Sequence, residues 1–122
     1  MKGQRYTLVW FLNGVLSEYP GKIDVDRGYV LGADYKPVTV VVRAKSAPGT
    51  GGVIIDINSD GVSLFTTNPG LSNGLTKYVG HTFGETGQSR LTKGSVVTLD
   101  IDSVGTTIPG TNLTVQLELE EL

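Results

Sequence analysis

The chain contains no cysteine, and this absence excludes disulfide bonds, thiolate zinc sites and cysteine nucleophiles together. Charge is also scarce, because only 18% of the 122 residues are charged, where an ordinary domain has about 25%. The formal net charge is -2, so the chain lacks the basic surplus that binds phosphate backbones. We therefore expect no nucleic-acid partner.

Long hydrophobic runs are missing as well. A membrane-spanning helix needs about 18 consecutive apolar residues, and no apolar stretch of this chain approaches that length. We therefore expect no membrane partner. The opening stretch, MKGQRYTLVWFLNG, has a basic residue before a short apolar run, but Tyr6, Thr7 and Asn13 interrupt that run. No small-residue cleavage site follows it. We interpret it as a first strand and expect a soluble protein that is made without a cleaved leader.

Helical periodicity is absent too, and apolar residues recur at every second position instead. The clearest run spans residues 113–120, where Leu and Val alternate strictly with Thr, Gln and Glu, as in a half-buried strand. Residues 38–45 show a similar alternation. Residues 6–12 are apolar at both phases, so we predict a strand that is buried on both sides, with Trp10 in the core.

Glycine, in contrast, is abundant, with 17 residues. Together with Pro, Asn and Asp it supplies turn signals between further predicted strands, at residues 28–31, 52–57, 62–66, 77–82 and 96–101. About eight short antiparallel strands with regular punctuation predict an all-β, single-domain β-sandwich over residues 1–122. The long connections at 17–27 and 67–76 fit the sheet-to-sheet crossings of a jelly roll or Greek key. The one possible helical turn lies near 71–76.

Residues 56–61 read DINSDG, the opening half of a calcium-binding EF-hand loop. Asp56, Asn58 and Asp60 match its first ligands, but Thr67 stands where a bidentate Glu should close the loop. The flanking residues are strand-like rather than helical. Because Asp-Gly is a strong signal for a hairpin turn, we interpret the string as a hairpin corner. The three polar residues are then a weak candidate calcium site at its tip, and we expect no cofactor.

Two carboxylate pairs are spaced to share one face of a strand: Asp24 with Asp26, and Asp100 with Asp102. Such a pair could serve a glycosidase or bind a cation. Glycosidase carboxylates, however, more often come from different strands. Leu99 and Ile101 alternate with the second pair, which favours a solvated strand face.

Catalytic patterns are equally sparse. His81 is the only histidine, so a serine triad would depend on it. No nucleophile-elbow string, Gly-x-Ser-x-Gly, accompanies it. We therefore predict that the protein is not an enzyme.

Aromatic side chains are few, with one Trp, three Phe and five Tyr. Tyr19, Tyr29, Tyr35 and Tyr78 lie near predicted loops and are candidates for stacking on sugars. The alternative is that exposed tyrosines lie at a subunit interface, where Tyr is enriched.

Three strings, GGVIIDINSDGVSLFTT, KGSVVTLDIDSVGTTIPG and TNLTVQLEL, carry a resemblance when taken in order. Their order and spacing resemble small jelly-roll domains in virion proteins of tailed bacteriophages, such as capsid decoration, head-fibre and tail-tip proteins. The match covers roughly the C-terminal two thirds of the chain. Ser95 departs from it, since the pattern more often has Asp there. The strings consist mostly of turn and core residues, so they bear on architecture more than on role.

The resemblance implies a non-enzymatic structural protein in the virion, assembled in the host cytoplasm. By analogy it would act as a homo-oligomer, a trimer, on the capsid as a decoration or head-associated domain, or on the tail. The alternative is a carbohydrate- or receptor-binding module of a phage tail, or a lectin-like cell-surface domain that binds surface glycans. Besides the N-terminal segment and the 78–87 loop, the candidate contact residues are Arg43, Lys45, Tyr78, His81, Phe83, Thr107 and Ile108.

Overall fold

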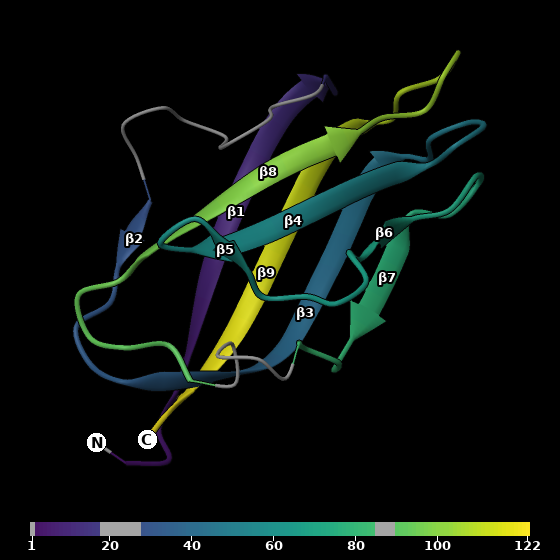
Figure 1. Ribbon diagram of the computed structural model, residues 1–122. Coiled ribbons are helices and arrows are strands. Elements are labelled where there is room, and N and C mark those ends of the chain that lie inside the picture. The colour runs from purple at the N-terminus through teal and green to yellow at the C-terminus, as the bar shows by residue number, and fades with distance from the viewer. Residues whose placement is uncertain (1, 18–27, 85–89) are drawn as a thin grey trace.

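The computed structural model describes residues 2–17, 28–84 and 90–122 and contains two antiparallel sheets. Strand β9 (Thr111–Glu121) lies inside one of these sheets, with a neighbouring strand on each side. The two sheets face each other as layers (Figure 1). The other strands are β1 (Arg5–Val15), β2 (Tyr29–Val30), β3 (Tyr35–Ser46), β4 (Val53–Ser59), β5 (Val62–Ser63), β6 (Gly70–Leu71), β7 (Lys77–Gly80) and β8 (Val96–Ser103). Within the described ranges, no helix is long and apolar enough to cross a membrane.

Successive strands cross between the sheets at almost every step. One sheet has the order β1-β9-β3-β7, and the other has the order β2-β8-β4-β5, with β6 also paired to β4. The two ends of the chain therefore pair with each other, because β1 lies beside β9 along its length. Crossing connections of this kind make a jelly-roll sandwich. The predicted all-β sandwich of antiparallel strands is confirmed.

The core lies between the sheets and follows from the alternation along β9. The inward residues of β9 are at most 1% exposed: Leu113, Val115, Leu117 and Leu119. Strands β4 and β8 supply the facing side chains, equally buried: Ile55, Ile57, Leu99 and Ile101. Full burial of such a side chain stabilises the fold by about 1.5–3 kcal/mol. Polar residues at the alternate positions of β9 point outward.

The first strand departs from its prediction. Leu8 and Trp10 pack against the core, although Trp10 is only partly buried. The opposite face of β1 is open, with Val9 41% and Phe11 59% exposed. The prediction that this strand is buried on both sides was wrong, since none of the described residues forms a further layer over this face.

Strand boundaries shift most where the chain turns between sheets. The predicted strand 62–66 is reduced to β5, while β3 and β8 run further than predicted. Strand β6 lies in the segment that was predicted as a crossing. The prediction of a helical turn near 71–76 was wrong, because Leu71 is in β6 and Leu75 donates its N–H to the Ser72 carbonyl in a turn.

Strand β6 approaches β4 so closely that Gly70 has no room for a side chain. A Cβ at Gly70 would overlap the carbonyl oxygen of Val53 and lie 3.0 Å from the Ile54 Cα. Both are backbone groups, which cannot move aside as a flexible side chain can.

We predict that Gly70→Ala destabilises the fold by about 3 kcal/mol, because relief of the overlap must separate β6 from β4. The measurement is the urea unfolding midpoint. Gly32→Ala is the matched control, since a Cβ at Gly32 meets nothing within 4 Å. Equal midpoints for the two variants would contradict the close approach.

Candidate functional site

The DINSDG string forms the end of β4 and the turn into β5. Ser59 pairs with Val62, so Asp60 and Gly61 are the turn residues. Both have positive φ, 50° for Asp60 and 83° for Gly61. Two successive residues of this kind form a type I′ turn, which matches the twist of the flanking strands. The string is therefore the corner of a hairpin, as interpreted from the sequence.

The three candidate calcium ligands in this string are engaged with three different partners. Asp56 Oδ1 accepts a hydrogen bond from Ser63 Oγ (2.5 Å), and Asp60 Oδ1 accepts one from the Val96 N–H (2.9 Å). Asn58 is buried and donates through Nδ2 to Asp100 Oδ2 (2.8 Å). Over the ranges that the structure covers, no group of three or more His, Cys, Asp or Glu side chains could hold a metal ion.

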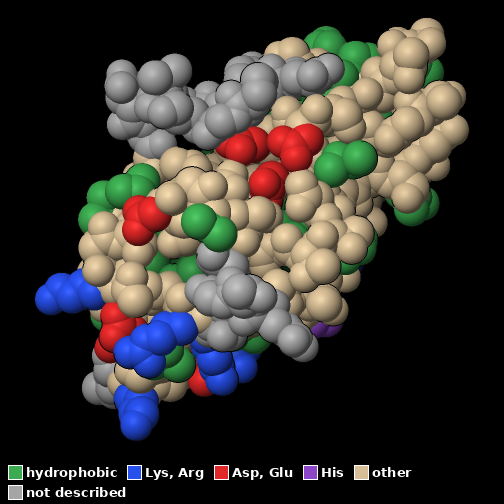
Figure 2. Space-filling model, viewed as in Figure 1, with side chains coloured by type: hydrophobic (Ala, Val, Ile, Leu, Met, Phe, Trp, Pro, Cys, Tyr) green, Lys and Arg blue, Asp and Glu red, His purple; other side chains and the backbone are tan. Residues whose placement is uncertain are grey.

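Acidic side chains gather on the outward face of β4 and β8 (Figure 2). Asp56 and Asp100 are register partners, and Asp102 lies two residues further along β8. Asp102 is exposed, as a solvated strand face requires, but Asp100 is only 7% exposed. The solvated-face prediction was therefore wrong for Asp100, which the Asn58 amide contacts. Asp24 and Asp26 lie outside the described residues.

Asp56 is half-buried in this cluster. Burial raises the pKa of its carboxyl above the ordinary 3.8, and the nearby Asp102 carboxylate raises the pKa further. The hydrogen bond from Ser63 opposes both effects. Ionisation of this carboxyl is therefore less favourable in the folded protein than in the unfolded chain.

The other sheet exposes a face that combines apolar and basic side chains, which we call the outer sheet face. Register places Val9, Gln116, Val41 and Val79 in one row across all four strands. The next row contains Phe11, Thr114, Arg43 and Lys77. Two shallow depressions of about 150 and 350 Å³ lie on this face, the larger between Phe11, Arg43 and Lys45.

Among the described residues, the ion pairs of the outer sheet face lie at one of its ends. Arg5 Nη1 lies 2.9 Å from Glu118 Oε1, and Lys36 Nζ lies 3.7 Å from Glu120 Oε1. At the opposite end, three basic side chains have no carboxylate within ion-pair distance among the described residues: Arg43, Lys45 and Lys77. One end is therefore basic and the other is charge-balanced.

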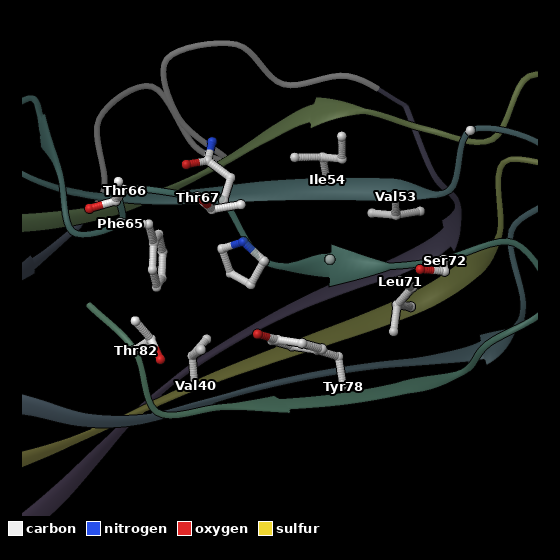
Figure 3. Close-up of a pocket in the computed structure, with 14 residues that line it drawn as sticks. Val40, Val53, Ile54, Phe65, Thr66, Thr67, Leu71, Ser72, Tyr78 and Thr82 are labelled. Atoms are coloured by element: carbon white, nitrogen blue, oxygen red, sulfur yellow. The ribbon is translucent and has the colours of Figure 1, made fainter. Parts of the chain in front are cut away.

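A second concave feature, which we call the edge cleft, opens where β6 of one sheet lies beside β7 of the other. Its volume is about 670 Å³. Tyr78 lies along one wall beside Val40, with Thr82 on the far side of Val40, and Phe65 and Thr66 lie at one end (Figure 3). The described lining residues are Val40, Gly51, Val53, Ile54, Phe65, Thr66, Thr67, Asn68, Pro69, Gly70, Leu71, Ser72, Tyr78 and Thr82.

The predicted contact residues are distributed over four places, since Tyr78 lines the edge cleft. Arg43, Lys45 and His81 lie on or beside the outer sheet face, and His81 Nδ1 is 3.2 Å from Thr39 Oγ1. Phe83 is instead stacked on Phe65, with ring centroids 5.5 Å apart, and packs against the core.

Thr107 and Ile108 lie in an exposed loop at the end of the sandwich. This loop is tied to a neighbouring loop, since the Ile108 carbonyl accepts the Gly49 N–H at 2.7 Å. Residues 85–87 of the predicted 78–87 contact loop lie outside the described residues.

Of the described tyrosines that were proposed to stack on sugars, only Tyr78 lines the edge cleft. Tyr29 donates its hydroxyl to the Val9 carbonyl at 2.6 Å, and its ring packs edge-on against Trp10. Tyr35 packs edge-on against Tyr6 in the same way. Tyr19 lies outside the described residues.

Sequence reasoning missed Val9 and Phe11 as surface residues, whereas Val79 lies within the predicted 78–87 contact loop. The apolar residues at both phases of 6–12 were a usable signal, because an edge strand with one open face has the same pattern as a doubly buried strand.

Comparison with protein-family models and with curated protein sequences finds no match. Any role for these surfaces therefore has to be argued from their chemistry.

We predict that Asp56→Asn stabilises the protein at neutral pH, and that this gain shrinks as the pH falls through the raised pKa of Asp56 and is lost below about 4. The wild-type carboxyl has a raised pKa in the folded state, so its ionisation lowers stability as the pH rises, whereas Asn does not ionise. The measurement is the free energy of unfolding by urea as a function of pH.

Asp34→Asn is the control of opposite sign. The Lys93 backbone N–H and the Arg90 guanidinium hold the pKa of Asp34 below its ordinary value. That variant should be less stable than the wild type at neutral pH, and the two proteins should have equal free energies of unfolding in acid. A stability loss in Asp56→Asn that does not change with pH would contradict the account of Asp56.

Proposed function

We propose that this chain is a non-enzymatic structural protein of a bacteriophage particle, which binds a neighbouring virion protein through its outer sheet face. The observation that carries the docking role is the group of apolar side chains on this face, which β1, β3 and β7 supply on either side of the polar residues of β9. Val9 is 41% exposed, Phe11 59% and Val79 42%. Single exposed apolar residues are ordinary, but several gathered on one face are typical of an interaction surface.

The arrangement of charge supports a protein partner. Aromatic and Arg side chains are enriched in interfaces, and here Phe11 and Arg43 lie in one row beside Thr114. The basic end of the face would pair with carboxylates of the partner. Such pairing chiefly sets the orientation and rate of association, while the exposed apolar side chains supply the affinity.

The assignment to a phage particle depends on the resemblance carried by residues 51–67, 93–110 and 111–119. Those segments form the β4–β5 hairpin, strand β8 with its following loop, and strand β9. The neighbouring protein would be a second copy of this chain in a homo-oligomer, or a capsid or tail protein.

We predict that Phe11→Asp weakens association of the chain with itself or with purified phage particles by at least about tenfold. A carboxylate at this position would have to be desolvated within the contact. The measurements are sedimentation velocity of the protein alone and co-sedimentation with particles. Thermal unfolding of each variant establishes that the fold is retained.

Val62→Asp is the matched control, because Val62 is 54% exposed but lies in β5 of the other sheet. It should associate like the wild type. A wild-type protein that stays monomeric and binds neither particles nor cell surfaces would overturn the proposal. So would equal losses in the two variants.

A further inference from the structure

The edge cleft has no part in the docking role, and its lining has a distinct composition. None of its described lining residues carries a charge. Six of them have a side-chain hydroxyl or amide, namely Thr66, Thr67, Asn68, Ser72, Tyr78 and Thr82. The rest are apolar or glycine. A concave site with apolar walls and several polar groups is the usual form of a small-molecule site.

Tyr78 presents a flat aromatic surface in this cleft. It lies on the inward side of β7 and is 40% exposed. The ring extends along its own strand over Gly80, where a Cβ would come within 2.7 Å of the Tyr78 hydroxyl oxygen and 2.8 Å of a ring carbon. Gly80 therefore makes the space in which the ring lies flat along the wall of the cleft, as Figure 3 shows for Tyr78.

The hydroxyl groups around this ring are not used by the fold. Across the described part of the chain, the side chains of Thr66, Thr67, Ser72 and Thr82 make no hydrogen bond. All four are exposed. In the close-up, Thr66 and Thr82 lie at one end of the cleft, above and below the space between the sheets, and Ser72 lies toward the other end (Figure 3).

We propose that the edge cleft binds a neutral saccharide, with one sugar ring stacked on Tyr78. The apolar C–H face of a sugar packs against an aromatic ring, while its hydroxyls need uncharged donors and acceptors around the rim. A Thr or Ser hydroxyl can both donate and accept a hydrogen bond. The uncharged lining offers no counter-ion to a phosphate, a carboxylate or an amine, so it favours a ligand without charge.

The dimensions suit this ligand class. The cleft volume of about 670 Å³ lies within the range of about 300–1,000 Å³ typical of ligand sites. Asn68 at the rim is held by its Nδ2 hydrogen bond to Asp102 Oδ2 (3.0 Å), which leaves the side-chain oxygen as an acceptor. The apolar walls come from both sheets, with Val40 from β3 and Val53 from β4.

The test is a titration of the ¹⁵N-labelled protein with glucose, galactose, mannose, N-acetylglucosamine and their β-linked disaccharides, followed by amide chemical shifts. We expect at least one sugar to shift amides in residues 66–72 and 78–82, with a dissociation constant of about millimolar order. Tyr78→Ala should weaken that binding about tenfold, and Tyr78→Phe less, because the stacking surface stays. Gly80→Ala should weaken it several-fold, because its Cβ displaces the ring. Glucuronate should bind more weakly than glucose.

Tyr6→Ala is the matched control, since Tyr6 is also 40% exposed but does not line the cleft. It should bind as the wild type does. Thr82→Val, which keeps volume and removes one hydroxyl, tests the site if Tyr78→Ala does not fold. The proposal is overturned if no sugar shifts the cleft amides at tens of millimolar, if the shifts lie elsewhere, or if Tyr6→Ala loses as much as Tyr78→Ala. Such a failure would leave the docking role of the outer sheet face untouched.

Discussion

The packing of β9 against the opposite sheet is the interaction on which the rest of the structure depends. Four inward side chains of this strand are fully buried between β1 and β3 on its two sides and β4 and β8 across the core. Because side chains alternate along a strand, this one contact sets which residues of the neighbouring strands face outward. A slip by one residue would exchange the buried and solvent faces of the whole sheet.

Both candidate surfaces follow from that register. On the outer sheet face it brings Val9, Val41 and Val79 into one row, although they come from three separate strands. At the open edge it turns Tyr78 inward beside Val40, where the sheets separate. One surface is broad, partly apolar and basic at one end, and the other is concave and uncharged. They differ as a protein-docking face differs from a small-ligand site.

Much of the fold could be predicted from the sequence, because alternation in 113–120 and the Asp-Gly turn at 60–61 are local signals. The two-residue strand β6 could not, since Gly70 pairs with Ile54 only through a close tertiary approach. The sequence also left open whether one face of β1 is exposed, because apolar residues on both faces of a strand occur in buried strands and in docking faces alike. The edge cleft had no sequence signature, because Phe65, Tyr78 and Thr82 meet only once the sheets are stacked.

The most direct test of this account is the cross-strand register, measured by nuclear Overhauser effects between Hα protons. The Val9 carbonyl accepts the Tyr29 hydroxyl and so faces away from β9, which makes Val9–Gln116 a closely spaced, non-hydrogen-bonded pair. The same alternation makes Val41–Val79 such a pair. The account predicts strong Hα–Hα effects for these two pairs. Effects from Val9 to Val115 or Leu117 instead would contradict it, because that slip turns Val9 and Phe11 into the core.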